Sequence, residues 1–490
     1  MAELSPLSII VQLCKILQLE GIVYCHWKSN SAIDRSASGD NDLDLLVSRC
    51  EIQRFREILT RLGFKECLAN KVNQIPGVQD FFGYDPRADK FVHVHAHYQL
   101  IIGHDLSKNY HLPLEQSYLD SAQQCGLFKL PAPEYELVIF VIRMVIKHST
   151  WTAVLTREGA LSKTEKQELA CLETQVDRLK VIRILQQYLP FIDIKLFDEC
   201  LSTLRPGFPL MKRIAAGSRL LNKLTPFQRR SRLEDWLLKL WRRFILVFQW
   251  RVFKKSPKYR LADGGAVVAI VGGDGSGKTT VVNELAQWLS NEFEINTFHL
   301  GKPRWSLTTI VIRGIVKIGR SLGFYPFERA EIQYTNDKDL LKFPGYPWMI
   351  REVCTGRDRY LTYTKAQRYA TNGGVVICDR YPLPEIKFMD GPQIERLTKN
   401  YPLNMFIKYM LDLEKHFYLP IMTPDLLIVL RTDPEIATQR KKDEDSISVR
   451  QRSTEIWEID WSNTTAHVID GGRDKAEVLS DVKALVWTRL

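Results

Sequence analysis

Residues Gly272 to Thr279 have the types and spacing of a phosphate-binding loop. They read GGDGSGKT, which matches the pattern GxxxxGK[ST], and they lie between the apolar run AVVAIV and the amphipathic stretch VVNELAQWL. Glycines allow successive backbone N–H groups to turn inward around phosphate oxygens, and the N-terminus of a following helix adds positive potential. A chance glycine-rich turn is the alternative, but a strand before the loop and a helix after it favour binding of ATP or GTP.

Two side chains of this loop have specific expected roles. Lys278 would reach the β- and γ-phosphates, and Thr279 would supply a hydroxyl ligand for Mg²⁺. ATP and Mg²⁺ are therefore the expected cofactors. The other loop residues expected to contact the nucleotide are Gly272, Gly273, Asp274, Gly275, Ser276, Gly277 and Thr280.

Two later segments extend the pattern. VVICDRYP occupies residues 375–382, and PDLLIVLRTDPEIATQRKKDEDSISVRQR begins at Pro424. In order and spacing, the loop and these segments resemble the signature regions of thymidylate kinase-like nucleoside monophosphate kinases, over residues 266–490. The resemblance implies a P-loop domain with a doubly wound parallel sheet, and a phosphotransferase that moves the γ-phosphoryl group of ATP to an acceptor.

The resemblance also assigns roles to three charged residues. Asp274 matches the acidic residue that faces the sugar of the acceptor in these kinases. Asp379 would hold Mg²⁺ through water, and Arg380 would grip the acceptor phosphate by paired hydrogen bonds. An ion pair that closes the end of a strand is the alternative for this motif, although such strands point their carboxyl ends at the phosphate loop.

The charged segment 440–452, RKKDEDSISVRQR, resembles the mobile lid of these kinases. Some family members place an arginine in the phosphate loop to neutralise the transferring group, and Ser276 occupies that position here. The lid should then supply the arginine, which is worth on the order of 10³ to 10⁵ in rate in related enzymes. A solvated charged turn is the alternative. The candidates are Arg450 and Arg452 for catalysis and Arg440, which is also expected to contact the nucleotide.

The sequence departs from thymidylate kinases on the acceptor side. PLPEIKFMDGP replaces a serine-rich stretch that ends in Ala-Tyr-Gln, and a long aromatic-rich insert separates the first two motifs. The acceptor is therefore expected to be a nucleoside monophosphate, a sugar or another phosphate-bearing small molecule. Aromatic residues of the insert could stack on a base, although core packing is favoured, and its arginines are candidates for the acceptor phosphate. These residues are Trp305, Tyr346, Trp348, Arg357, Arg359 and Arg368.

Asp42 and Asp44 point to a second kind of chemistry. In GDNDLDLLV they are one residue apart on a predicted strand, so both side chains leave the same face, which suits Mg²⁺. Residues 18–105 resemble the nucleotidyltransferase superfamily, which implies Mg²⁺-dependent nucleotidyl transfer at these aspartates. In the turn HWKSN, however, Lys28, Ser29 and Asn30 stand where small residues are expected.

The strand expected to bring a third carboxylate carries histidines. FVHVHAHYQL places His93, His95 and His97 on one face. Histidine is a poor ligand for Mg²⁺, so the three would suit a transition metal or would donate to phosphate when protonated. A hydrogen-bonded hydrophilic sheet face is the alternative, and whether this domain keeps its activity is left open.

These motifs predict an α/β protein with several domains. Residues 1–105 would form a small mixed-sheet nucleotidyltransferase-like domain, 106–253 a helical connector, 254–265 a linker, and 266–490 the P-loop domain. The net charge of +11 is concentrated between Lys212 and Arg260, which hold 15 Lys and Arg against two acidic residues. The aromatic-rich helix predicted there favours packing between domains, with peripheral membrane contact through residues 229–260, or nucleic acid, as alternatives.

The composition limits which other classes of protein the chain can belong to. The nine cysteines are scattered and never spaced as CxxC, which argues against a zinc knuckle or a disulfide framework. No apolar run reaches the length of a membrane span, so we expect a cytoplasmic protein that meets a membrane only at its surface, if at all. A small-molecule acceptor is the expected partner, nucleic acid is not expected, and a homodimer is left open. A non-catalytic protein in which ATP acts as a switch is the further alternative.

Overall fold

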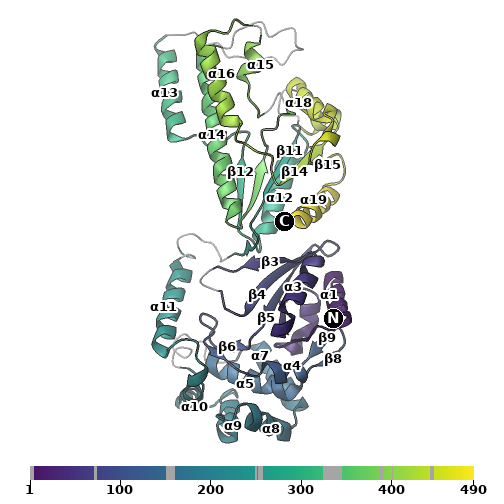
Figure 1. Ribbon diagram of the computed structural model, residues 1–490, viewed down its shortest axis with the longest axis vertical. Coiled ribbons are helices and arrows are strands. Elements are labelled where there is room, and N and C mark those ends of the chain that lie inside the picture. The colour runs from purple at the N-terminus through teal and green to yellow at the C-terminus, as the bar shows by residue number, and fades with distance from the viewer. Residues whose placement is uncertain are drawn as a thin grey trace. The chain divides into compact units, whose positions relative to one another are not determined.

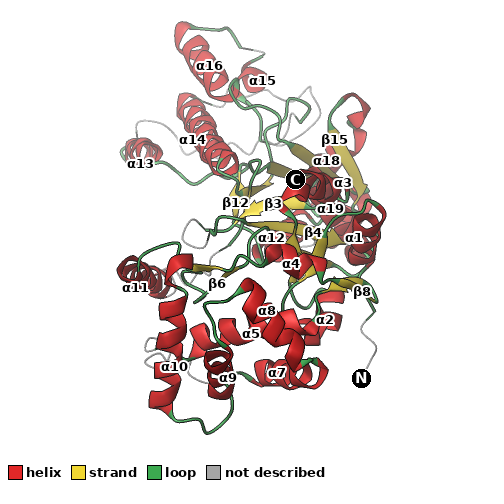
Figure 2. Cartoon of the chain, turned by 60° about the horizontal axis from the view of Figure 1, so that its bottom comes forward, coloured by secondary structure: helices red, strands yellow, loops and turns green. Residues whose placement is uncertain are grey.

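The chain forms two compact units, Met1–Pro257 and Lys258–Leu490, each containing helices and strands (Figures 1 and 2). The computed structural model describes residues 5–70, 74–150, 161–248, 251, 258–323, 345–386, 390–399, 401–441 and 446–490. Within these ranges no helix combines the length and the apolar character needed to cross a membrane. Both units are described separately below.

The N-terminal unit is built on a mixed sheet with the order β1-β2-β5-β4-β3. Strands β2 and β5 run parallel, and the other neighbouring pairs are antiparallel. Along β5, Val92, Val94 and Ala96 alternate with the histidines, so the apolar side chains enter the core and the histidines occupy the opposite face. The strands are β1 (Tyr24–His26), β2 (Leu43–Val47), β3 (Lys65–Leu68), β4 (Val78–Asp85), β5 (Lys90–His97), and the hairpin pairs β6 (Ile101–Ile102) with β7 (Tyr110–His111) and β8 (Gln123–Cys125) with β9 (Phe128–Leu130).

Helices α1 and α3 cover the apolar face of this sheet. The buried side chains of α1 recur at helical spacing and pack with Phe55, Ile58 and Leu59 of α3. The helices of the unit are α1 (Ser8–Leu19), α2 (Ile33–Ala37), α3 (Ile52–Arg61), α4 (Glu115–Asp120), α5 (Pro133–His148), α7 (Lys163–Gln175), α8 (Arg178–Tyr188), α9 (Ile194–Thr203), α10 (Leu210–Lys223) and α11 (Arg232–Phe248).

The segment predicted as a helical connector completes the N-terminal unit. Its central helix α5 is buried along most of its length, and its core continues into Cys25, Trp27 and Leu46 of the sheet region. The segment also contains strands β7, β8 and β9, whose two- and three-residue lengths are too short to produce a recognisable alternation. Of the predicted linker, residues 254–257 lie outside the described ranges, and Arg260–Leu261 form β10 in the C-terminal unit.

The C-terminal unit contains a parallel sheet with the order β12-β13-β11-β14-β15, as predicted for the region after residue 266. The middle strand β11 is buried throughout, which explains its uninterrupted run of apolar residues. Val267, Ala269 and Val271 face a core shared with α14. The strands are β11 (Val267–Gly272), β12 (Ile295–His299), β13 (Val375–Asp379), β14 (Leu426–Arg431) and β15 (Ala466–Asp470).

Helices lie on both faces of this sheet, with α14 on one and α12 and α19 on the other (Figure 1). Strands β11, β13 and β14 therefore deliver their carboxyl ends to one edge, where the phosphate loop follows β11. The helices are α12 (Lys278–Ser290), α13 (Leu307–Ser321), α14 (Tyr346–Thr371), α15 (Ile394–Thr398), α16 (Met405–Tyr418), α17 (Pro434–Arg440), α18 (Ser446–Glu458) and α19 (Lys475–Arg489).

Candidate functional site

The phosphate loop connects β11 to α12 through a backbone that only glycine adopts easily. Gly275 and Gly277 have φ angles of 83° and 88°, in the left-handed region. A Cβ atom on Gly275 would lie 2.3 Å from the carbonyl oxygen of Ala437, and one on Gly273 would lie 2.6 Å from the Cα of Ser453. The loop is thus in close contact with α17 and α18.

Lys278 begins α12 and is buried beneath the loop. Its Nζ donates a hydrogen bond to the carbonyl oxygen of Gly273 at 2.6 Å. Burial, followed by the charge of Arg380, lowers the pKa of Lys278 to about 8. An anionic ligand in the loop would reverse this shift, because negative charge favours the protonated amine.

Asp274 is the centre of a cluster of three cationic side chains. Its Oδ1 accepts a hydrogen bond from Arg380 Nη2 at 2.8 Å, and its Oδ2 accepts one from Arg452 Nη1 at 2.7 Å. Lys278 Nζ lies 3.9 Å from Oδ1. Burial would raise the pKa of Asp274, but the hydrogen bond from Arg452 and the neighbouring cations hold it below its ordinary value. One carboxylate therefore holds three cations together beside the phosphate loop.

Asp379 and Arg380 lie where β13 ends beside the loop, as their sequence motif predicts. The Oδ1 of Asp379 is buried and has no hydrogen-bond partner among the described residues, and its Oδ2 lies 4.0 Å from His299 Nε2. A buried carboxylate oxygen without a partner is a suitable ligand for a hard cation such as Mg²⁺, directly or through water. Thr279, the other expected ligand, is exposed on the first turn of α12.

Arg380 has a backbone conformation that is unusual for a residue with a side chain. Its φ angle is 63°, and its N–H donates to the carbonyl oxygen of Ile270 on β11. Its Nη1 also lies 3.7 Å from Asp390 Oδ2. Strained backbone of this kind persists where the surroundings fix it, and it is common at functional sites.

The three arginines predicted in the lid have separate positions. Arg452 on α18 reaches Asp274, and the neighbouring Ser453 Oγ donates to the Asp274 carbonyl oxygen at 3.0 Å. Arg450 is exposed and pairs with Glu435. Of the two arginines predicted for catalysis, Arg452 alone therefore contacts the phosphate-loop carboxylate, and residues 442–445 of the lid lie outside the described ranges.

Arg440 lies at a small cavity beside the loop. Its Nη1 donates to the carbonyl oxygen of Gly471 at 2.8 Å. The cavity has a volume of about 240 Å³ and is lined by loop residues as well as by Arg440 and Arg473. Arg440 thus lies beside the phosphate loop, and its expected contact with the nucleotide stays a prediction. The loop residues at the cavity are Ser276, Gly277 and Thr280.

A larger cavity, of about 910 Å³, opens beside Asp379. Its cations were not predicted as site residues, because they are spread over the β12–α13 connection and α14 without a recognisable motif. Trp305 lines it and is 55% exposed, so its predicted core position is wrong, as is that of Tyr346, which is 43% exposed. Trp348 is partly buried against the core formed by α14 and α16. The polar residues at the cavity include His299, Lys302, Arg304, Asp358 and Lys365.

The arginines predicted for the acceptor phosphate have other contacts. Arg359 is buried, donates to the carbonyl oxygens of Leu300 and Gly301, and lies 3.3 Å from Asp390. Arg357 contacts Thr308, and Arg368 lines a separate shallow pocket near the end of α14. The sequence could not distinguish them, because all three lie on one long helix whose faces meet different surroundings.

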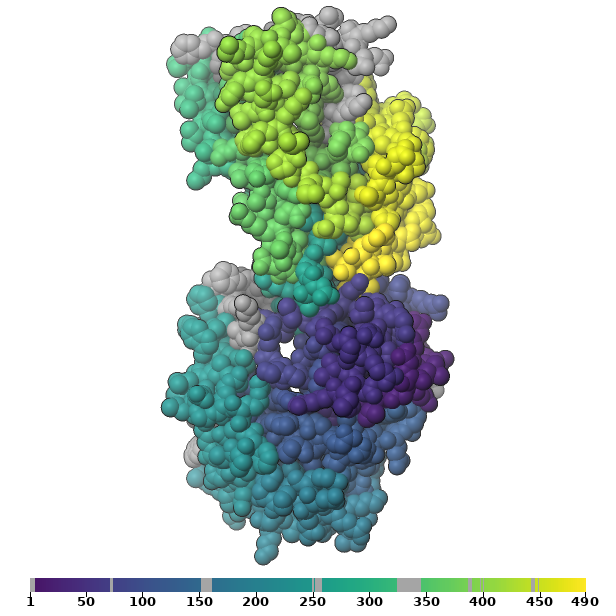
Figure 3. All heavy atoms as spheres, in the orientation of Figure 1, coloured from purple at the N-terminus to yellow at the C-terminus, as the bar shows by residue number. Residues whose placement is uncertain are grey.

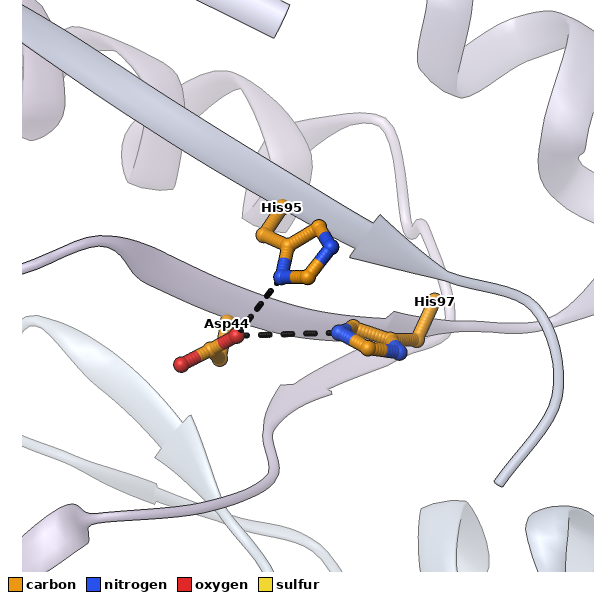
Figure 4. A group of neighbouring side chains, drawn as sticks. All are labelled: Asp44, His95 and His97. Atoms are coloured by element: carbon orange, nitrogen blue, oxygen red, sulfur yellow. Dashed lines mark hydrogen bonds and ion pairs between the residues drawn. The ribbon is translucent and has the colours of Figure 1, made fainter. Parts of the chain in front are cut away.

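In the N-terminal unit, strands β2 and β5 bring Asp44, His95 and His97 together (Figure 4). Asp44 Oδ1 lies 3.2 Å from His95 Nδ1 and 3.6 Å from His97 Nε2, and all three candidate ligand atoms lie within 4.8 Å of one another. His97 is buried, its Nε2 faces Asp44, and its Nδ1 has no hydrogen-bond partner among the described residues. Two imidazoles and one carboxylate suit a transition metal better than Mg²⁺.

Lys28 and Asp42 modify this site. Lys28 Nζ forms an ion pair with Asp44 Oδ1 at 2.7 Å. Burial would raise the pKa of Asp44, but the Lys28 ammonium and the hydrogen bond from His95 hold it well below its ordinary value. Asp42 is largely exposed and pairs with His93 on the same sheet face. The two aspartates therefore share a face, as predicted, but contact different histidines.

His93 is held between two carboxylates. Its Nδ1 lies 3.0 Å from Asp42 and its Nε2 lies 2.9 Å from Asp80. Although burial opposes it, these two carboxylates raise the pKa of His93 to about 9. Asp80 lies on β4, beside the histidine strand, and was not predicted as a site residue because its strand VQDFFGYD gives no metal signal.

A cavity of about 470 Å³ adjoins Asp44, His95 and His97. It is lined by side chains from five segments, among which basic and acidic groups are nearly balanced. Arg143 and Lys147 are four residues apart on α5, and Glu165 and Glu168 are three apart on α7, so each pair shares a helix face. The charged residues are Lys28, Arg35, Lys108, Arg143, Lys147, Asp44, Asp105, Glu165 and Glu168.

Known proteins that resemble the chain are described as ATP-binding. It is 27% identical over 227 residues to the uncharacterized ATP-binding protein YghR of Escherichia coli (strain K12), which is 45% of this chain and 86% of YghR. It is 26% identical over 218 residues to the uncharacterized ATP-binding protein YghS of the same strain, covering 44% of this chain and 89% of YghS. No protein-family model matches the chain.

A solved structure of deoxyadenosine kinase from M. mycoides with bound dATP shares 17% sequence identity and covers 45% of this chain and 98% of its own. Its TM-score is 0.28, a value at which the likeness carries no argument about fold or function.

Proposed function

We propose that the C-terminal unit is an ATP-dependent kinase that transfers the γ-phosphoryl group to a nucleoside monophosphate or a related small molecule. The observation that carries the proposal is the convergence of Lys278, Arg380 and Arg452 at the phosphate loop, beside the unpartnered oxygen of Asp379. The ATP-binding descriptions of YghR and YghS support the nucleotide part of the proposal.

Each residue has a role that follows from its place. The loop N–H groups and Lys278 would hold the β- and γ-phosphates, with Arg440 beside the nucleotide at the smaller cavity. Mg²⁺, held through Thr279 and Asp379, would neutralise phosphate charge. Arg380 and Arg452 would neutralise the transferring group and the acceptor once phosphate oxygens replace Asp274 as their hydrogen-bond acceptors.

Transfer requires little covalent chemistry from the protein. The bond from the γ-phosphorus to the bridging oxygen of ADP breaks as a bond to an acceptor oxygen forms. The cavity of about 910 Å³ beside Asp379 would receive the acceptor, with Trp305 available to stack on a ring and Lys302 and Lys365 available to bind anionic groups.

The test is ADP release from Mg·ATP in the presence of nucleoside monophosphates and sugar phosphates. Lys278→Ala should abolish acceptor-dependent release. Lys408→Ala, a change at an exposed lysine on α16, should leave it unchanged. Release that is independent of any acceptor would instead favour an ATP-driven switch.

A second candidate function concerns the N-terminal unit. We infer that Asp44, His95 and His97 bind a transition metal next to the cavity of about 470 Å³, where nucleotidyl transfer would take place. The approach of His97 Nε2 to Asp44 and the buried Nδ1, which has no hydrogen-bond partner among the described residues, support a ligand at this point. Lys28 would have to release Asp44 when the metal binds.

Isothermal titration with Zn²⁺ tests the metal without depending on activity. His97→Ala should abolish Zn²⁺ binding, and Lys28→Met should increase the affinity for Zn²⁺. His111 lies outside the cavity, so His111→Ala should leave the affinity for Zn²⁺ unchanged. Equal Zn²⁺ binding by the wild type and His97→Ala would contradict the assignment. Loss of labelled-nucleotide incorporation in Asp44→Ala, with ADP release intact, would then connect the metal to nucleotidyl transfer.

A further inference from the structure

Helix α11 buries two charged residues and leaves most of its large apolar residues exposed. Its two buried residues are Asp235 and Arg242. Asp235 pairs with Lys239 at 2.6 Å, and Arg242 Nη1 donates to the carbonyl oxygen of Leu106 at 2.7 Å. A helix on the surface of a globular unit normally buries its apolar face and exposes its charges, so this arrangement needs a separate explanation.

The exposed side of α11 is a continuous apolar stripe. Eight large apolar side chains, each 46% to 67% exposed, recur at intervals of three and four residues. At about 100° per residue they occupy an arc of roughly 140° around the helix. Isolated exposed apolar residues are ordinary, but a contiguous patch marks an interaction surface. The stripe consists of Leu233, Trp236, Leu237, Leu240, Trp241, Phe244, Val247 and Phe248.

The stripe lies at the surface of the N-terminal unit, and the unit fixes the helix at its start. In Figure 3 the teal segment that includes α11 forms part of the outer surface. Before the helix, the Arg229 N–H donates to the Asn109 carbonyl oxygen at 2.8 Å, and Asn109 Nδ2 donates to the Arg230 carbonyl oxygen at 3.0 Å. Together with Arg242, these contacts hold the polar side of the helix against the unit and its apolar side outward.

The charge around the stripe is positive. Arg232 and Arg243 are exposed and lie along one border of the stripe. The stretch from Lys212 to Arg260 holds 15 Lys and Arg against two acids. Of these acids, Asp235 is buried in an ion pair, and Glu234 is exposed at the other border of the stripe. A second copy of this chain would bring the same positive border into contact with itself, which is unfavourable, whereas an anionic surface would be attracted.

We propose that α11 binds the surface of an anionic lipid membrane. Its tryptophan, phenylalanine and leucine side chains would enter the boundary between headgroups and acyl chains, and Arg232 and Arg243 would meet the headgroups. For this segment the sequence favoured packing between domains and left contact with a membrane surface as an alternative. The sequence showed the helical periodicity of this segment, but it did not show which face of the helix the N-terminal unit covers.

Flotation of the full chain with vesicles tests the proposal. The chain should float with phosphatidylcholine vesicles that contain phosphatidylglycerol, and much less with pure phosphatidylcholine. Trp241→Glu with Phe244→Glu should lower the bound fraction about tenfold or more, because two large apolar side chains no longer leave water. Arg243→Gln should lower it about fivefold on anionic vesicles alone.

A matched control places the same charge elsewhere. Leu19→Glu with Leu179→Glu changes two apolar residues of this unit that are 85% and 65% exposed but isolated, and binding should be retained. Unfolding midpoints of all variants would show that they are folded. Absence of binding to anionic vesicles would overturn the proposal, as would a dimer in solution that the α11 double variant converts to monomer.

Discussion

At the scale of single residues, the burial of Lys278 makes ATP binding dependent on pH. Its pKa is about 8 in the ligand-free protein, and a triphosphate beside it would raise that pKa towards its ordinary value of about 10.5. Above pH 8 binding must therefore take up a proton, so affinity should fall as pH rises from 8 to 10.5.

Calorimetry in buffers of different ionisation enthalpy would measure this uptake. At pH 9 the wild type should take up close to one proton per ATP, given these two pKa values. Lys278→Arg, which stays protonated throughout this range, should show no such uptake. An equal proton count in the two proteins would mean that another group titrates.

The left-handed backbone of Arg380 leads to a second residue-scale prediction. Arg380→Gly and Arg380→Ala lose the same ion pair with Asp274, but glycine adopts a φ of 63° without strain. The glycine variant should be the more stable of the two by about 1 kcal/mol, the reverse of the usual order. Urea unfolding of the C-terminal unit would measure the difference, and a more stable alanine variant would contradict it.

At the scale of elements, contact between the phosphate loop and α18 can be tested through two glycines. A methyl group on Gly273 would displace Ser453, so Gly273→Ala should destabilise the C-terminal unit by about 1 to 3 kcal/mol. Gly314, in the middle of α13, has open space around it. Gly314→Ala should stabilise by up to about 1 kcal/mol. Thermal unfolding of the two variants would show opposite shifts.

Elements whose own residues show an uninterrupted pattern, such as an apolar run followed by glycines, were predictable from the sequence. The strand, loop and helix around Gly272–Thr279 were predicted because the buried strand β11 is apolar throughout and glycines follow it. Arg452 and Arg450 could not be separated, because a helix of low amphipathicity does not reveal which side faces the loop. The contacts of Asp80 with the β5 histidines and of Lys28 with Asp44 depend on strand pairing between distant segments, which local patterns do not specify.

At the scale of the whole molecule, the division into two compact units predicts two unfolding transitions. Mg·ATP should raise the midpoint of one transition by mass action and leave the other unchanged. Lys278→Ala should remove the ATP-dependent shift. Zn²⁺ should raise the midpoint of the other transition in the wild type but not in the His97→Ala variant. A single transition that responds to both ligands would show that the units unfold together.

The loop that holds α11 also lines the N-terminal cavity. Gly103, Asp105 and Lys108 are at the cavity, while the Leu106 and Lys108 carbonyl oxygens accept hydrogen bonds from Arg242 and Arg229. Because the helix cannot roll away from these contacts, a bilayer bound by its apolar stripe would always meet the same side of the unit.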